Sequence, residues 1–447
     1  MRAVTLDCTV FSSAAARFMP PVRATASNIL SSAVSMRSDL SLLAIAFIIT
    51  NRLIASSGAD NWRTMSHRSA SNRSPVYVAL GGLIAMAVAI GIGRFVYTPI
   101  LPPMMAALGL SKSASGLIAS ANFAGYLVGA LAATRATLPG PRRVWLPGAL
   151  VLSAATTAAM ALAGSVAVFM LLRFIGGVAS ALVLILASAL VLDHLVLVGR
   201  PKLASLHFAG VGVGIAVSAA LVAVQLASRA GWASMWAISG GVSLAGAIAV
   251  ALLVPDSEPP APLVRTVPGA RRDPRLVRMT AAYGLFGFGY VITATFLVAI
   301  VRATPAIREL EPVVWIVVGL AAAPSVLLWT LLGRRIGLQS AFAVAAMTEA
   351  AGVLASVLWP SGAGICVAAV LVGGTFMGLT ALGLMRAREL GQDNPRRAMA
   401  AMTGAFGVGQ IAGPLLAGVV SDALGGFMVP SLAAAGGLVL AAWLVRR

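Results

Sequence analysis

The chain has 447 residues, of which 59% are hydrophobic and only 10% charged, and its mean hydropathy is +0.95. A soluble protein carries about 25% charged residues, so this chain has too few ionic groups to cover a soluble surface of its size. Its net charge of +19 would suit a nucleic-acid partner, but the basic residues lie in short clusters between long apolar runs. That arrangement is typical of membrane topology, so we expect an integral membrane protein and no nucleic-acid partner.

The first 75 residues differ in composition from the rest of the chain. Arg residues are scattered there among Ser and Ala, and the one apolar stretch, 40–50, is shorter than the roughly 20 residues of a spanning helix. We expect residues 1–75 to be an N-terminal extension that is disordered or precedes the true start, for which Met65 is a candidate. An interfacial or organelle-targeting segment is the alternative.

From residue 76 onward, apolar runs alternate with short polar turns. The runs predict twelve helices, each long enough to cross a hydrocarbon core about 30 Å thick. The Pro- and Arg-rich segment 255–278 is expected to be a cytoplasmic linker between six-helix bundles at 76–254 and 279–447. The expected helices are 76–100, 114–134, 144–163, 166–191, 207–227, 232–254, 279–300, 313–332, 338–358, 363–385, 398–420 and 427–445.

The basic residues of the loops predict the orientation of these helices. Eighteen Arg and Lys residues fall in the loops and tail on one side and only four, Lys112, Arg229, Arg302 and Arg308, on the other. Because positive residues concentrate on the cytoplasmic side, both termini are expected to be cytoplasmic. We therefore expect a multi-pass protein of the plasma (bacterial inner) membrane.

Short strings in the first six helices recur in the last six. These repeats indicate that the second six helices are a copy of the first six. A six-helix repeat returns to the same side of the membrane, so the two copies have the same orientation, as in transporters with a binding site between two halves. At an offset of roughly 195 residues, Gly91-Ile92-Gly93 recurs as Gly287-Phe288-Gly289, Gly212-Val213-Gly214 as Gly407-Val408-Gly409, and the pair Arg142 and Arg143 as Arg334 and Arg335.

Several motifs resemble a known family. With twelve helices split six and six, the string Arg173-Phe174-Ile175-Gly176-Gly177 resembles the major facilitator superfamily. Segments 91–104, 120–126, 207–214 and 283–293 are similar to its YbfB/YjiJ-type branch. The resemblance covers residues 76–445 and implies an all-α membrane fold of twelve transmembrane helices in two pseudo-symmetric halves. It also implies transport by alternating access, without naming a substrate.

The loop after the second helix departs from the superfamily pattern, which is G-x-L-x-D followed by a basic pair. Ala133 stands where the Asp belongs, although Arg142 and Arg143 follow, and the second copy at Arg334 and Arg335 also lacks the acid. We expect these two arginine pairs to act in the inner-gate loops without an acidic partner.

Arg94 and Arg173 are expected at similar depth inside the membrane. A charge that faced lipid there would cost from about 2.5 to over 10 kcal/mol, so each must face a cavity or a partner. In the superfamily fold, the first and fourth helices line the central cavity. Two guanidinium groups there would favour an anionic substrate, because Arg binds carboxylates bidentately. The alternative is that each Arg caps backbone carbonyls or extends to the interface.

Other polar residues lie on helices that the resemblance places around the cavity. They could bind substrate or bridge helices, and Gly409 and Gly413 have the spacing of close helix packing. Pro414 is expected to kink its helix. The substrate-binding candidates, in addition to Arg94 and Arg173, are Tyr97, Asn122, Tyr126, Tyr290, Thr293 and Gln410.

Glu349 and His207 are the candidates for proton coupling. Glu349 is an acid well inside an apolar run, and intramembrane carboxylates often relay protons. His207 opens the fifth helix and could titrate near neutral pH. The alternatives are a neutral Glu that fills a packing niche and an ordinary His at the membrane interface.

Cys and His residues never occur at metal-ligand spacing, and the chain has no phosphate-binding loop of the ATPase type. We therefore expect no metal and no cofactor, and no enzyme. The favoured function is a monomeric, proton-coupled secondary transporter of a small, anionic organic solute. A drug or metabolite efflux antiporter is the alternative; a membrane-embedded enzyme or a solute sensor would be a different class.

Overall fold

The computed structural model describes residues 74–135, 142–254, 273–392 and 394–446. Most of the expected N-terminal extension, 1–73, and of the expected linker, 255–272, lies outside the described residues, as do the side chains of Arg142 and Arg143. All regular secondary structure in the described ranges is helical.

We call residues 74–254 the first half and residues 273–446 the second half. In the first half, α4 (Pro75–Met86), the π-helical turn η1 (Ala87–Ile92) and α5 (Tyr97–Leu108) form one span, followed by α6 (Lys112–Arg135), α7 (Arg142–Ala159), η2 (Met160–Leu162), α8 (Val166–Leu197), η3 (Pro201–Leu203), α9 (Ala204–Ala227) and α10 (Trp232–Leu253). The second half contains α11 (Pro274–Ala303), η4 (Pro305–Leu310), α12 (Glu311–Ala322), α13 (Ser325–Ile336), α14 (Leu338–Leu358), α15 (Gly362–Leu390), α16 (Pro395–Leu424) and α17 (Met428–Arg446).

By length and composition, eleven spans in the described residues can cross a membrane, and a bent pair makes twelve. The twelve-helix membrane fold expected from the sequence is confirmed. The bent pair is α12 and α13, which meet at 42° where a single helix, 313–332, was expected. Pro324 lies in this break, and because proline lacks a backbone N–H it interrupts the helical hydrogen bonds.

The first span also differs from the continuous helix expected over 76–100. It contains the π-helical turn η1, in which the Gly93 N–H donates to the Val88 carbonyl at 2.8 Å, and a hydrogen-bonded turn over residues 93–96. After this turn α5 continues to Leu108. Single π turns are frequent at functional sites, and this one displaces the backbone beside Arg94.

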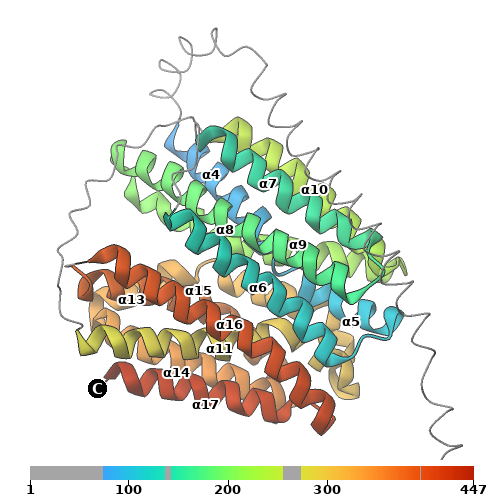
Figure 1. The fold of residues 1–447 in the computed structure, drawn as a ribbon. Helices are drawn as coiled ribbons and strands as arrows, with labels where there is room; N and C mark the ends of the chain where they lie inside the picture. The colour runs from blue at the N-terminus through green and yellow to red at the C-terminus, as the bar shows by residue number, and fades with distance from the viewer. Residues whose placement is uncertain (1–73, 136–141, 255–272, 393, 447) are drawn as a thin grey trace, which may run out of the picture. The chain divides into compact units, whose positions relative to one another are not determined.

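Figure 1 shows the helices of the first half together above those of the second half. The halves meet where α6 packs along α16, α9 along α12, and α5 along α11. A residue near the middle of α5, α6, α11 or α16 is therefore placed to contact the opposite half.

The repeated glycines occupy helix crossings in both halves. A Cβ on Gly91 would lie 2.5 Å from the Gly214 Cα, so η1 and α9 can approach only because both positions are glycine. In the second half, a Cβ on Gly287 of α11 would lie 2.6 Å from the carbonyl oxygen of Phe406 in α16. The glycine repeats thus allow close contact between the first and fifth spans of each half.

Candidate functional site

Arg173 is bonded to the broken part of the first span. Its Nη1 and Nη2 groups donate to the carbonyls of Gly93 and Arg94 at 2.7 and 2.8 Å. The Thr98 N–H bonds to the Phe95 carbonyl instead of continuing the regular ladder to Arg94. Arg173 thus satisfies carbonyls at the break, as a capping side chain does.

Tyr97 and Asn122 complete this arrangement in the first half. The Arg173 guanidinium carbon lies 5.3 Å from the centre of the Tyr97 ring and 5.8 Å from the centre of the Trp236 ring. Asn122 donates through Nδ2 to the Arg173 carbonyl at 2.7 Å, and the Tyr97 hydroxyl donates to the Ser115 carbonyl at 2.9 Å. We call Tyr97, Asn122 and Arg173 the brace, because their contacts tie α5, α6 and α8 together.

Arg94 is the opposite case, a buried cation with unused donors. Its guanidinium carbon lies 4.3 Å from the centre of the Tyr126 ring, 5.0 Å from that of Phe123 and 5.8 Å from that of Phe95. These aromatic rings stabilise the charge through their electron-rich faces. The Nε and Nη2 groups of Arg94 have no hydrogen-bond partner among the described residues, although the residue is only 7% exposed.

The second half faces Arg94 with polar and aromatic side chains. Gln410 of α16 donates through Nε2 to the Tyr290 hydroxyl of α11, and its own Oε1 accepts no hydrogen bond from any described group. The Tyr290 ring stacks in parallel on Phe376 and Phe406, with ring centres 5.7 and 5.8 Å apart. Phe376, on which Tyr290 stacks, also contacts the ring of Phe95, the chain neighbour of Arg94, so these side chains adjoin across the boundary between the halves.

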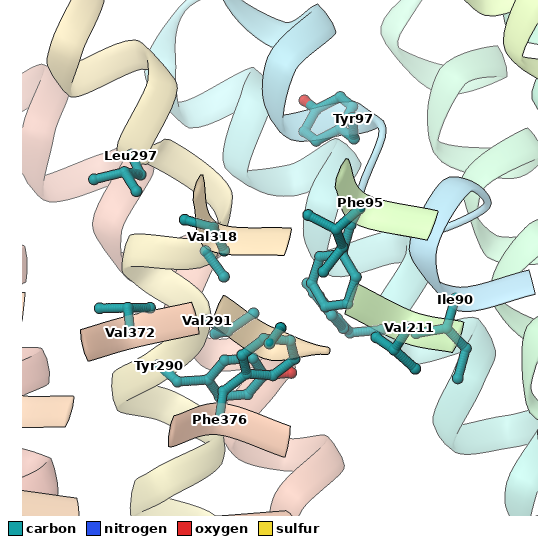
Figure 2. Packing of buried hydrophobic residues seen from close by; sticks show 14 of the residues in the cluster. Ile90, Phe95, Tyr97, Val211, Tyr290, Val291, Leu297, Val318, Val372 and Phe376 are labelled. Atoms are coloured by element: carbon teal, nitrogen blue, oxygen red, sulfur yellow. The ribbon is translucent and has the colours of Figure 1, made fainter. Parts of the chain in front are cut away.

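Phe95 connects the halves at this point. Its ring centre lies 5.8 Å from that of Phe376 and 6.3 Å from that of Trp315, both in the second half. Figure 2 shows Phe95 between the Val211 side chain and the pair formed by Tyr290 and Phe376. We define the Arg94 cluster by the polar members and rings that meet here: Arg94, Phe95, Phe123, Tyr126, Tyr290, Phe376, Phe406 and Gln410.

The structure thus divides the eight substrate-binding candidates. Arg94, Tyr126, Tyr290 and Gln410 come together in the Arg94 cluster. Thr293 lies three residues after Tyr290, on the same side of α11; it is fully buried and its hydroxyl has no partner within the described chain. Tyr97, Asn122 and Arg173 form the brace instead.

The two candidates for proton coupling lie in different places. Glu349, in α14, is fully buried, and neither carboxyl oxygen has a hydrogen-bond partner in the described part of the chain. His207 is fully buried in the first half, with Nε2 3.1 Å from the Ser188 Oγ. His207 lies in the first turn of α9, and Gly82 leaves room for its ring between α4 and α9.

Hydrogen bonds between the halves occur at the ends of α6 and α16. Asp422 of α16 accepts from the backbone N–H groups of Lys112 and Ser113 at 3.1 and 2.8 Å, and from the Ser113 Oγ at 2.5 Å. A carboxylate at this position caps the start of α6 and complements its helix dipole. We call this contact the Asp422 latch.

Two further hydrogen bonds join the halves between the latch and the Arg94 cluster. The Thr98 Oγ1 donates to the Ala294 carbonyl at 2.6 Å, and the Ser120 Oγ donates to the Ile411 carbonyl at 2.7 Å. Together with the latch they close one end of the boundary between the halves.

The arginine pairs expected in the inner-gate loops lie at the other end. Arg334 and Arg335 are exposed in the last turn of α13, and Arg334 lines an open cavity together with Glu389. Within the described residues, no three His, Cys, Asp or Glu side chains are grouped to hold a metal.

The phenylalanines of the cluster and the Asp422 latch are not among the candidates predicted from the sequence. Phe95, Phe123, Phe376 and Phe406 are ordinary apolar residues in apolar runs, so no local signal separates them from core residues. Asp422 had a usable signal, since it is an acid near the end of a predicted span.

The sequence model of the family described as "uncharacterised MFS-type transporter YbfB" matches residues 86–446, most of the chain. The chain belongs to this family of the major facilitator superfamily. It is therefore a multi-pass membrane transporter, and the resemblance inferred from its motifs is confirmed. No curated protein sequence matches the chain.

Solved transporters share the fold at low sequence identity. A mutant of the nucleoside transporter NupG is 14% identical, with a TM-score of 0.64 over 83% of this chain and 99% of that chain. A bacterial homologue of the human lysosomal transporter Spinster, in an inward-facing and occupied conformation, is 17% identical, with a TM-score of 0.60 over 83% of this chain and 94% of that chain. The same homologue in an unoccupied conformation is 16% identical, with a TM-score of 0.59.

Proposed function

We propose that this transporter carries a small organic anion across the plasma membrane by alternating access, coupled to protons, and that it works as a monomer. The substrate binds at the Arg94 cluster, where the two halves meet. Transport then consists of opening this position to each side of the membrane in turn.

The observation that carries the proposal is the unsatisfied guanidinium of Arg94. Buried polar groups nearly always have hydrogen-bond partners, yet two N–H-bearing nitrogens of Arg94 have none among the described side chains and backbone. A carboxylate would accept from both in a bidentate pair. The surrounding rings of Phe95, Phe123 and Tyr126 favour a substrate with an apolar or planar body.

The anion site involves one arginine rather than the two suggested by the sequence. Both terminal nitrogens of Arg173 donate to backbone carbonyls and its Nε alone lacks a partner in the described chain, so we assign Arg173 to positioning the backbone of Arg94. This corresponds to the capping alternative for Arg173.

Glu349 is the stronger candidate for proton coupling. A charged carboxylate without donors is costly in the membrane interior, so this environment accommodates the neutral acid better. Its helix, α14, packs against α11, the helix that carries Tyr290. His207 lies between helices of the first half.

The arginine distribution supports cytoplasmic termini, because α13, α15 and α17 all end at the arginine-rich side. In this orientation the Asp422 latch closes the extracellular side. Its contacts must separate when the transporter opens outward.

The experiment compares matched carboxylates and carboxamides, beginning with benzoate and benzamide, as stabilisers of the purified protein in thermal unfolding. We expect stabilisation by carboxylates alone, and its loss in Arg94→Gln but not in Arg302→Gln, since Arg302 is paired with Glu311 at 3.2 Å. Equal stabilisation by the amides, or an unchanged response in Arg94→Gln, would contradict the anion site.

A further inference from the structure

A second cationic site lies away from the Arg94 cluster. A cavity of about 290 Å³ opens at the arginine-rich ends of α11, α14, α15 and α17. Arg275 and Arg278 of α11, Arg386 of α15 and Gln339 of α14 supply its polar lining, and Met279 and Leu444 supply part of its apolar lining.

The charge of this cavity is not neutralised by the described part of the chain. Neither Arg275 nor Arg278 forms an ion pair there, and the nearby Asp273 carboxylate accepts from the backbone N–H of Arg275 at 2.8 Å as the helix cap. Arg386 is shared between Glu389 at 2.8 Å and the Gln339 Oε1 at 3.2 Å. The cavity therefore keeps a net positive charge and favours an anion.

Apolar surface inside and beside the cavity indicates an amphiphilic anion. Met279 is 2% exposed and forms part of the lining. Met385, which lines the adjoining cavity, is 37% exposed, as expected of a side chain that contacts acyl chains. The volume is at the lower end of the range of about 300–1,000 Å³ for ligand pockets, which suits a headgroup.

We propose that this cavity binds the phosphate headgroup of an anionic phospholipid of the cytoplasmic leaflet. Arg275 and Arg278 contact the phosphate, and the acyl chains lie along the exposed apolar side chains beside them. Basic pockets between helices at the cytoplasmic surface are suited to this class of lipid, because the leaflet concentrates anionic headgroups there.

A neighbouring cavity is a weaker candidate for binding an anion, because a carboxylate lies in its lining. That cavity, about 380 Å³, shares Gln339 and Arg386 with the first but also contains the Glu389 carboxylate in its lining. A carboxylate repels a phosphate, so the neighbouring cavity is the weaker anion site.

The test uses full-length protein in lipid nanodiscs of phosphatidylcholine, titrated with phosphatidylglycerol and read by native mass spectrometry and by melting temperature. The variant is Arg275→Gln with Arg278→Gln. The matched control is Arg200→Gln with Lys202→Gln, which removes the same charge from exposed residues at the arginine-rich end of the first half. A separate arm titrates inorganic phosphate without anionic lipid.

We expect phosphatidylglycerol to bind the wild type and the control equally and the Arg275/Arg278 variant about 10- to 30-fold more weakly, from about 1 kcal/mol for each arginine near an anionic surface. The melting temperature in phosphatidylcholine alone shows that the variant is folded. If the affinity for phosphatidylglycerol fell equally in the variant and the control, the lipid would be attracted by the surface charge in general, and the proposed site would be overturned. Stabilisation by inorganic phosphate that matches the lipid and depends on Arg275 would overturn the lipid assignment.

Discussion

The Nη2 group of Arg173 donates to the backbone carbonyl of Arg94 at 2.8 Å, so one intramembrane arginine holds the chain that carries the other. Arg173 uses its charge to satisfy a broken helix, whereas Arg94 keeps donors free where the halves meet. The two residues therefore have different expected mutant phenotypes.

Replacing Arg173 is expected to lower the stability of the first half and to leave substrate specificity largely unchanged. Arg173→Gln removes charged hydrogen bonds to two buried carbonyls, each worth about 1.5–3 kcal/mol. Thermal unfolding of the purified protein should show a clearly lower melting temperature than that of Arg94→Gln. A stable Arg173→Gln protein that has lost only substrate binding would contradict the brace.

The contact of Gly91 with Gly214 predicts a packing defect. In Gly91→Ala the new Cβ would meet backbone atoms of α9, and overpacking of this kind costs about 1–3 kcal/mol. The control is Gly436→Ala in α17, where a Cβ has nothing within 4 Å. The melting temperature should fall for the first substitution alone; equal behaviour of the two variants would argue against the close crossing.

Loss of the Asp422 latch is expected to favour the outward-open state. Asp422→Ala removes the cap of α6, worth about 1–2 kcal/mol, or roughly a tenfold change in the ratio of states. Spin labels at Leu108→Cys and Leu424→Cys, with Cys8 and Cys366 replaced by Ser, would report the distance between the latched ends. Longer distances are expected in Asp422→Ala and not in Asp193→Asn, where the acid is exposed at the far end of α8; unchanged distances would contradict the latch.

Glu349→Gln is expected to uncouple transport from protons. The amide keeps the shape of the neutral acid but cannot release a proton, so exchange of substrate across the vesicle membrane should persist while uphill accumulation driven by a pH gradient is lost. Glu309→Gln, at an exposed acid, should accumulate substrate like the wild type. Normal accumulation by Glu349→Gln would remove this residue from the coupling.

The sequence predicted the twelve helices because apolar runs and charged turns are local signals. It also named Arg94 and Tyr290 as substrate-binding candidates, and this remains a prediction. It did not predict the turn before Tyr97, because the carbonyls there are bound by Arg173 from another helix, nor the burial of His207, which depends on space left by Gly82. Contacts between helices that are far apart in the sequence produce no regular spacing of residue types, so a single sequence does not predict them.

The most direct test of the central claim is uptake into proteoliposomes of a carboxylate that stabilises the purified protein, measured for wild type, Arg94→Lys and Arg94→Gln. Loss of charge-assisted hydrogen bonds worth about 3 kcal/mol corresponds to about 100-fold weaker binding. We predict that Arg94→Gln raises the half-saturation concentration to about this extent and that Arg94→Lys, which keeps the charge, retains part of the affinity. Carboxylate uptake that is equal in all three proteins would contradict the claim that Arg94 binds an anionic substrate.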